Sequence, residues 1–347
     1  MKFATLEDGT IDGHPVLVSR DLRWAASVGD LAPSLLQLIE RWDTFTAELE
    51  RRSAQLNAAV LINRKRFEPA KTAAPLPRAP QWLDGSTFPS HGARMVKAFG
   101  LSDRSPKIDS PLMYQGVSDS FLGAHAAMPL PSEEHGIDLE AELAVITAEV
   151  PMNSSSANCA RHIRLLTLVD DVSLRNLQSK EMSLGFGMIH SKPTCVFSPV
   201  CVTPDELGDA WCGGKMHLTM RIELNGRMIG QLSGSEMAFT FTDLIAHGAR
   251  TRRLSAGTIV GSGTFSNADS TRGIGCIAEK RALEMMEFGE PRTGWLRFGD
   301  RVRMEVRNDQ GESIFGAIDH TFIQAPVPEY DLNLELNMAT EDLKEAE

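Results

Sequence analysis

The chain has 347 residues, of which 42% are hydrophobic and 23% charged, enough to bury a large core and to exclude a disordered chain. Its net charge of -11 argues against nucleic acid as a partner, because a phosphate backbone requires a basic face. The first residues contain no apolar signal region, and no later run approaches the roughly 18 apolar residues of a membrane span. We therefore expect a cytoplasmic protein that does not enter a membrane.

Residues 1–75 are predicted to form a small N-terminal α/β domain. Short strands are expected at 2–4 and 15–18, beside Asp-Gly turns. Asp30 is expected to cap a single helix that runs from about residue 32 to residue 57 and carries an apolar stripe. This stripe predicts packing against the domain or an oligomer contact.

A β-rich catalytic domain is predicted over residues 76–326. Prolines between residues 67 and 81 predict an extended linker, and short alternating apolar runs follow it. Asn225-Gly226, between two such runs, predicts a tight hairpin. The acidic tail over residues 327–347 is expected to be either a helix from Thr340 onward or disordered.

The five cysteines are widely spaced and form no C-x-x-C pair, so they predict reduced thiols and neither a disulfide framework nor a zinc site. They are Cys159, Cys195, Cys201, Cys212 and Cys276.

The most informative segment alternates apolar residues with Asp138, Glu140 and Glu142 between Ile137 and Val145. In a strand this pattern places the three acids together on one face, where carboxylates two residues apart can converge on one cation. The same pattern is also typical of an exposed strand face solvated by water. Taken alone, the alternation leaves both interpretations open.

Two further segments with acidic and basic residues, read together with this one, indicate a particular family. Together with Trp82–His91 and Leu168–Gln178, the Asp-x-Glu-x-Glu segment at 138–142 resembles the fumarylacetoacetate hydrolase family over roughly residues 80–325. The resemblance implies an α+β, β-rich fold, with a mixed β-roll or barrel catalytic domain behind the small N-terminal domain. It also implies a homodimer.

A metal site is implied by the same resemblance. Its ligands would be Asp84, Glu140, Glu142 and Asp171, and the ion Mg²⁺ or Ca²⁺, with Mn²⁺ as a further option and no organic cofactor. Carboxylate oxygens suit such hard cations, and four anions in one pocket practically require a positive charge.

The resemblance also implies the roles of six other residues. The general base, its carboxylate partner and the oxyanion-stabilising lysine would be His91, Glu279 and Lys192, and the substrate would be met by Arg175, Gln178 and Thr264. Seven residues separate Asp84 from His91, so the two share a helix face or, because Pro89 intervenes, Asp84 precedes the helix.

The implied reaction is metal-dependent hydrolysis of a carbon–carbon bond in a β-diketone acid. The leading substrate is fumarylacetoacetate, cleaved to fumarate and acetoacetate in tyrosine or related aromatic breakdown. Acylpyruvate or fumarylpyruvate hydrolysis, oxaloacetate decarboxylation and 2-oxo-dienoate hydration on the same site are alternatives, as is a non-catalytic binding protein on the same fold.

Departures from the family pattern limit the assignment of a substrate. Ser86 stands where fumarylacetoacetate hydrolase has a substrate-contacting tyrosine, and only Tyr114 and Tyr330 are available to restore that contact. Asn176 stands where the family has an aspartate after the arginine. Val169 and Asp170 stand directly before Asp171, where the family has an asparagine-containing segment.

Overall fold

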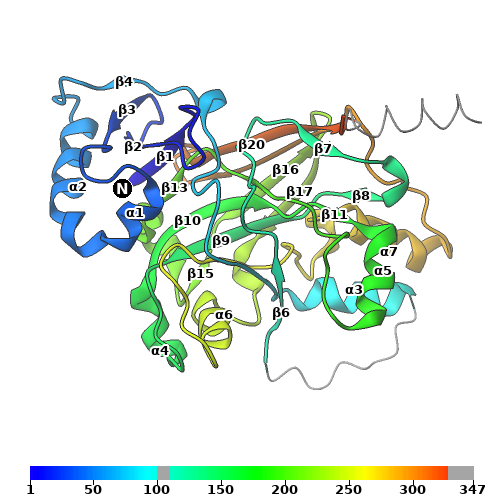
Figure 1. Cartoon of the computed structure of the whole chain (residues 1–347). Helices are drawn as coiled ribbons and strands as arrows, with labels where there is room; N and C mark the ends of the chain where they lie inside the picture. Colours follow the sequence, from blue (N-terminus) through cyan, green and yellow to red (C-terminus); the bar gives the residue numbers. More distant parts are fainter. Residues whose placement is uncertain (100–109, 327–347) are drawn as a thin grey trace, which may run out of the picture.

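The computed structural model describes residues 1–99 and 110–326, which form an α+β protein built around two large sheets (Figure 1). The predicted tail at 327–347 lies outside the described residues. The larger sheet has eleven strands. Ten of them follow one another in the order β4 (Lys65–Arg66), β3 (Trp24–Ser27), β2 (His14–Val18), β1 (Lys2–Leu6), β13 (Cys201–Val202), β10 (Ile163–Asp170), β9 (Ala141–Thr147), β18 (Ile259–Gly261), β5 (Trp82–Ser86) and β6 (Leu112–Gly116). The eleventh, β12 (Val196–Phe197), also pairs with β10.

The second sheet has five strands and packs against the first. Its order is β17 (Arg227–Ser233), β16 (Thr219–Leu224), β19 (Arg301–Arg307), β20 (Ser313–Gln324) and β7 (Met128–Leu130). Two small pairs join β11 (Ser173–Leu174) to β8 (Ile137–Asp138), and β14 (Trp211–Cys212) to β15 (Lys215–Met216). Among the described strands no sheet order closes on itself, so the expected β-rich α+β fold is confirmed as open sheets without a closed barrel.

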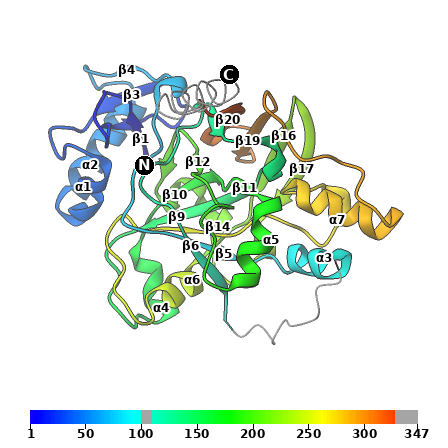
Figure 2. The same ribbon diagram turned by 45° about the vertical axis from the view of Figure 1, so that its right-hand side comes forward.

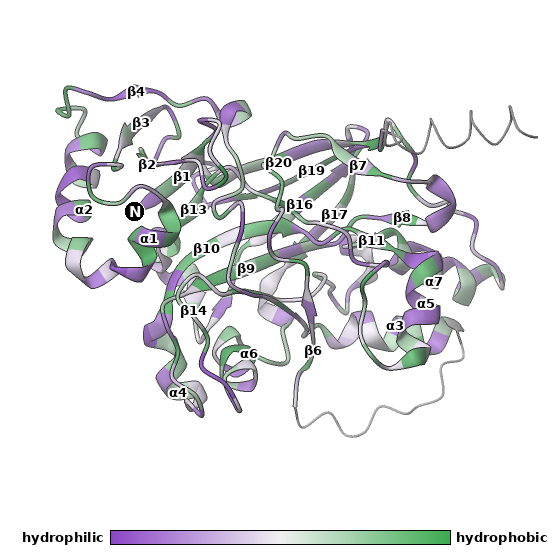
Figure 3. Cartoon of the chain, in the orientation of Figure 1, coloured by the Kyte–Doolittle hydropathy of each residue, from purple (hydrophilic) through white to green (hydrophobic). Residues whose placement is uncertain are grey.

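Strand β9 is buried on both faces because it lies in the middle of the larger sheet, between β10 and β18. Leu143 and Val145 join a core that includes Met304 of the second sheet. Ala144 and Ile146 point the other way, into a core shared with the N-terminal helices. Figure 3 shows the resulting hydrophobic colouring along the central strands.

The N-terminal helix is divided, and the prediction of one helix capped by Asp30 is wrong. The structure has α1 (Leu35–Glu40) and α2 (Trp42–Asn57), separated at Arg41, whose φ of -116° and ψ of 26° are not helical. Ser34 caps α1 by accepting from an amide of the first turn, because Pro33 disfavours helical geometry in the residue before it. Asp30 instead pairs with Arg52 at 2.6 Å.

The hairpin predicted at Asn225-Gly226 is confirmed by the pairing of β16 with β17. Asn225 and Gly226 have φ values of 52° and 75°, as a two-residue hairpin loop of the favoured handedness requires. Asn225 also contacts the start of β19, where its side-chain amide donates to Asp300 at 2.8 Å and its side-chain oxygen accepts from the amide of Arg301 at 2.9 Å.

The remaining helices lie around the ends of the sheets, and three of them gather at one end (Figure 2). These three are α3 (Pro89–Phe99), α5 (Arg175–Leu184) and α7 (Ile277–Phe288). Away from these three, α4 (Ser156–Cys159) and α6 (Phe241–Gly248) lie next to each other below β9 and β10 in the view of Figure 1. Short 3-10 helices in the described chain are Pro69–Lys71, Glu133–His135, Ala160–His162, Pro204–Ala210, Gly234–Glu236 and Ser270–Arg272. None of the helices in residues 1–99 and 110–326 has the length and apolar character needed to cross a bilayer.

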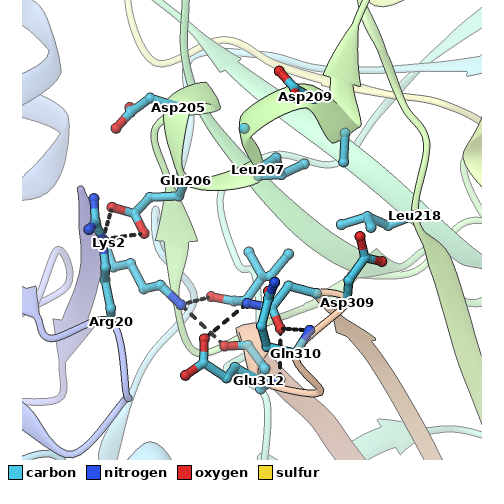
Figure 4. A pocket seen from close by; sticks show the side chains of 15 residues that line it. Lys2, Arg20, Asp205, Glu206, Leu207, Asp209, Leu218, Asp309, Gln310 and Glu312 are labelled. Atoms are coloured by element: carbon cyan, nitrogen blue, oxygen red, sulfur yellow. Dashed lines mark hydrogen bonds and ion pairs between the residues drawn. The ribbon is translucent and has the colours of Figure 1, made fainter.

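The N-terminal strands join the rest of the larger sheet through the pairing of β1 with β13, in which Lys2 lies opposite Val202. A cavity of about 470 Å³ adjoins this joint, and Figure 4 shows the side chains that line it. Lys2 is buried and donates to the carbonyl of Ile314 at 2.7 Å, while Arg20 meets Glu206 at 3.1 Å. These polar groups bind one another, so the cavity is part of the joint between the two regions.

Candidate metal and catalytic centre

The acid-rich segment at 137–145 is divided into two strands, and its acids are buried. It breaks into β8 and β9 around Glu140, whose amide donates to Asp170 Oδ1 at 2.8 Å. Asp138 and Glu142 are 0% exposed and Glu140 is 5% exposed. The alternative of a solvated acidic face is therefore excluded.

Asp138 serves the fold. Its carboxylate accepts from the amides of Ile277 and Ala278 at the start of α7, at 2.6 and 2.9 Å, and from Arg175 Nε at 2.8 Å. A carboxylate at a helix N-terminus satisfies amides that lack partners within the helix. Asp138 thereby fixes α7 and the arginine beside the candidate site.

Three of the four predicted ligands meet in the interior. Asp84 on β5, Glu142 on β9 and Asp171 after β10 are all buried, and each offers a carboxylate oxygen within 4.8 Å of the others. The amide of Gly263 donates to Asp84 Oδ1 at 3.0 Å and to Glu142 Oε2 at 3.1 Å. Glu142 Oε1 is buried and has no hydrogen-bond partner among residues 1–99 and 110–326.

Burial and mutual repulsion oppose the ionisation of this group. Burial, with the neighbouring Asp171 charge, raises the pKa of Asp84 to about 8. Burial and the charge of Asp84 likewise raise the pKa of Glu142 well above its usual value. Without a cation the group must hold protons, because several buried carboxylates cannot all be ionised at such short range.

The fourth predicted ligand, Glu140, is not in this group and is held by cations of the chain. Lys192 Nζ lies 2.5 Å from Glu140 Oε2 and 2.6 Å from Asp171 Oδ2, so it bridges the two acids. Arg175 donates to Glu140 Oε1 at 2.6 Å. Burial alone would raise the pKa of Glu140, but Arg175 and Lys192 outweigh it and hold that pKa well below its usual range.

The predicted base and its partner lie side by side, across the α3–α7 contact. Asp84 is on a strand and Pro89 begins α3, so His91 lies in the first turn of the helix and the shared-helix alternative is excluded. His91 Nδ1 is 3.6 Å from Glu279 Oε1, slightly beyond a hydrogen bond. Arg94 contacts the same oxygen at 2.9 Å.

Glu279 is ionised in this arrangement. Burial would raise its pKa, but His91, the hydroxyl of Ser266 and Arg94 together lower it. Its carboxylate is thus available to orient the imidazole and to stabilise its protonated form.

The predicted substrate residues all adjoin Glu140. The hydroxyl of Thr264 donates to Glu140 Oε1 at 2.7 Å. Arg175 Nη1 donates to Gln178 Oε1 at 3.0 Å, and the Gln178 amide contacts the sulfur of Met188 at 3.4 Å. The structure therefore brings Arg175, Gln178 and Thr264 into one cluster with the acids.

A surface cavity reaches this cluster. It has a volume of about 380 Å³ and is lined by Gln115, Gly116, Val117, Met188, Ile189 and Lys192. Lys192 is its buried end, because this side chain is the one that contacts the carboxylates. A small molecule that reaches the buried end of the cavity therefore meets the ammonium group of Lys192 before it meets the carboxylates.

The sequence did not identify two partners of the acids. Tyr114, one of the two tyrosines available to restore the family contact, instead donates from its hydroxyl to Asp171 Oδ2 at 2.7 Å and holds a candidate ligand. His320 pairs with Asp170 at 2.8 Å, and both side chains are fully buried. The position of Asp170 directly before Asp171 could have indicated a role for this acid near the site. Nothing near His320 in the sequence indicates that it pairs with Asp170.

Two family models together match most of the chain. The model "Fumarylacetoacetate (FAA) hydrolase C-terminal" matches residues 81–323, and "Fumarylacetoacetase N-terminal domain 2" matches residues 1–78.

Individual relatives are more distant. "Oxaloacetate tautomerase fahd2, mitochondrial" from Xenopus laevis is 26% identical over 207 residues, which is 59% of this chain and 58% of that protein. "2,4-didehydro-3-deoxy-L-rhamnonate hydrolase" from Sphingomonas sp. is 26% identical over 230 residues, 62% of this chain and 78% of that protein. The chain thus spans less than two thirds of the first relative and about three quarters of the second.

The fold is also found in solved structures. Maleylpyruvate hydrolase from Sphingobium sp. SYK-6, in complex with manganese(II) and pyruvate, superposes with a TM-score of 0.63 at 16% identity, over 94% of this chain and 100% of that chain. Motifs, fold and family models agree, and the chain belongs to the fumarylacetoacetate hydrolase family.

Proposed function

We propose that the protein is a divalent-metal-dependent enzyme that hydrolyses a carbon–carbon bond of a β-diketone acid. The observation that carries this proposal is the group of three buried carboxylates, Asp84, Glu142 and Asp171, next to the His91–Glu279 pair. Membership of an enzyme family supports catalysis over mere binding.

The residues fit a hard cation. Asp84, Glu142 and Asp171 would hold Mg²⁺, Ca²⁺ or Mn²⁺, since all three offer oxygen and Glu142 Oε1 has no hydrogen-bond partner in the described part of the chain. Glu140 adjoins them through Lys192. When bound, such an ion supplies a Lewis acid that orients the substrate oxygens and polarises the carbonyl.

The chain's own residues perform the proton transfers. His91 would take a proton from water as it adds to the carbonyl, and Glu279 would stabilise the resulting imidazolium. Lys192, at the buried end of the cavity, would face the oxyanion, and its charge is already fixed in place by Glu140 and Asp171. His91 then returns the proton to the departing carbon.

Fumarylacetoacetate is the first substrate to test, with tyrosine breakdown as the setting, and the other diketone acids follow. A second candidate reaction is the keto–enol tautomerisation of oxaloacetate, which is favoured by the name of the Xenopus relative. That reaction needs His91 to move a proton between carbon and oxygen, and it needs no added water.

The deciding assay supplies Mg²⁺ or Mn²⁺ and compares fumarylacetoacetate, acetopyruvate, fumarylpyruvate and oxaloacetate. Hydrolysis removes the ultraviolet absorbance of a diketone and releases two acids in equal amounts. Tautomerisation changes the enol absorbance of oxaloacetate without releasing a second product. Absence of any turnover with either ion would overturn the enzymatic proposal.

The variant His91→Ala should bind metal like the parent while its turnover falls by about 10²–10⁴-fold, because the base is lost and the carboxylates are not. Manganese binding, followed by electron paramagnetic resonance, provides the control. His247→Ala, on the distant helix α6, should change neither property. An unchanged rate in His91→Ala would remove the imidazole from the mechanism.

The family resemblance also suggests a homodimer, with a division of the chain near residue 75. Light scattering of the full chain would measure the mass in solution, and a monomer at micromolar concentration would contradict the proposed dimer.

A further inference from the structure

The cavity that ends at Lys192 has apolar side chains between its mouth and its buried end. Of the described residues that line it, Val117 directly follows β6, and Met188 and Ile189 belong to the segment after α5. Gln115 adds a neutral amide. Val117 is 37% exposed and Ile189 81%, so both lie toward the mouth. A ligand that extends from Lys192 to the surface therefore passes apolar groups.

The positive charge in this cavity is already balanced. Lys192 Nζ lies 2.5 Å from Glu140 and 2.6 Å from Asp171. Arg252 is not among the described residues that line the cavity, and its exposed side chain reaches it by donating to Gln115 Oε1 at 3.3 Å. An anionic group held between the apolar side chains would thus lose its water without gaining a charged partner there, which is unfavourable.

The segment that carries Met188 and Ile189 is held in place by one carboxylate. Glu181 accepts from the amides of residues 189, 190 and 191 at 3.1, 2.8 and 3.0 Å, and from the Ser191 hydroxyl at 2.6 Å. Such charge-assisted bonds are stronger than those between neutral groups. This side of the cavity is therefore preformed, and a ligand need not order it on binding.

Met188 also contacts the cluster of predicted substrate residues. Its sulfur lies 3.4 Å from Gln178 Nε2, and Arg175 donates to the oxygen of the same amide at 3.0 Å. A diketone acid whose oxygens face this cluster and Lys192 would direct its acyl group past Met188 toward the mouth. The acyl group is thus the part of the substrate that meets the apolar side chains.

We propose that Val117, Met188 and Ile189 form an apolar subsite for the acyl group, so that the enzyme prefers acylpyruvates with an apolar acyl group to those that end in a second carboxylate. This preference rests on the proposed function, which it narrows. Water adds to the acyl carbonyl, the bond to the methylene carbon of pyruvate breaks, and the pyruvate enolate takes up a proton. The products are pyruvate and the acid of the acyl group, and nothing is oxidised or reduced.

Two substrates of equal shape test the subsite. In isocaproylpyruvate an isopropyl group replaces the terminal carboxylate of succinylpyruvate. With saturating Mg²⁺, kcat/KM of the full chain should be about tenfold or more higher for isocaproylpyruvate, because the carboxylate must lose water between apolar side chains. Equal values, or a preference for succinylpyruvate, would overturn the subsite and favour Arg252 as the partner of the second carboxylate.

Substitutions at the subsite should change the ratio of the two kcat/KM values. Met188→Gln keeps the length of the side chain but makes it polar, and Val117→Lys adds a cation, so each should lower the ratio by about tenfold. Met152→Gln, at a methionine that is 61% exposed elsewhere, is the matched control and should leave the ratio unchanged. Val117 and Met188 are both partly exposed, so these variants should fold. A parental ratio in both variants would overturn the subsite.

Binding separates a failure of the subsite from a failure of the proposed function. Turnover of both acylpyruvates with equal kcat/KM would keep the proposed function and remove the subsite. If neither is turned over, the proposed function fails, and titration calorimetry of the full chain in Mg²⁺ with the same two acids decides. Isocaproylpyruvate should then bind about tenfold or more tightly than succinylpyruvate, and equal affinities would overturn the subsite.

Discussion

At the scale of single residues, the carboxylates of Asp84 and Glu142 couple the stability of the protein to pH. Burial and the charge of Asp171 raise the pKa of Asp84 to about 8, so between its ordinary value and pH 8 the folded chain keeps a proton that the unfolded chain releases. The unfolded chain then binds fewer protons, and the free energy of unfolding falls as pH rises.

We therefore expect the melting temperature of the metal-free protein to fall between about pH 5 and pH 8. The rise in melting temperature on adding Mn²⁺ should grow over the same range, because the ion displaces the protons. Calorimetry with EDTA or Mn²⁺ measures both trends, and Glu142→Gln should flatten them. A metal effect independent of pH would contradict this account.

The stability of the protein also depends on the buried pair of Asp170 and His320. His320 Nε2 lies 2.8 Å from Asp170 Oδ2, both side chains are buried, and the other Asp170 oxygen holds the amide of Glu140. His320→Phe should lower the free energy of unfolding by about 3–5 kcal/mol, because it leaves a buried acid unpaired. An added Asp170→Asn should recover part of the loss.

Urea unfolding measures these changes. The control is Arg253→Ala, which removes an exposed pair with Glu149 and should change the free energy by less than about 1 kcal/mol. Equal effects of His320→Phe and Arg253→Ala would show that the buried pair contributes no more than a surface pair.

At the scale of elements, the turn after β18 carries a conformation that only glycine adopts easily. Gly263 has a φ of 78°, and a Cβ atom there would lie 2.4 Å from the carbonyl oxygen of Gly85. Its amide binds Asp84 and Glu142, so Gly263→Ala should displace two candidate ligands and lower Mn²⁺ affinity by about tenfold or more.

Gly289→Ala is the matched control for this turn. Gly289 also has a positive φ, 81°, but a Cβ atom there would meet nothing within 4 Å. It should cost about 1 kcal/mol of stability and leave metal affinity unchanged. Titration calorimetry measures the Mn²⁺ affinity of both variants. Equal affinities would contradict a role for the Gly263 amide.

Elements could be predicted from sequence where their causes were local. The Asn225-Gly226 hairpin follows from two neighbouring residues. The break at Glu140 does not, because it depends on Asp170 and on a sheet that buries both faces of β9. Proximity of the acids was implied by motif resemblance, whereas the pairing of Glu140 with Lys192, 52 residues away, required the folded chain.

At the scale of the whole molecule, the N-terminal strands share the larger sheet with β13, β10 and β9, and a hydrophobic cluster contains residues of both regions. Phe3 is fully buried in a cluster that also contains Phe197 and Cys201. Its ring lies 5.6 Å from that of Trp42 on α2. The two regions should therefore unfold together.

Phe3→Ala should lower the free energy of unfolding of the whole chain by about 3–5 kcal/mol, in one transition. Circular dichroism and Trp fluorescence would follow the transition. Phe288→Ala, at a side chain that is 43% exposed, should have a much smaller effect. Two separate transitions, with only the first shifted, would contradict a shared core.

The pairing of Lys2 with Val202 also has a consequence during translation. The first strand leaves the ribosome long before its second neighbour, and at about 5–20 residues per second that neighbour follows roughly 10–40 seconds later. Throughout that interval the nascent sheet carries an open edge that can pair with another chain. We therefore expect chaperone capture of ribosome-bound chains to end once residues around Val202 have emerged.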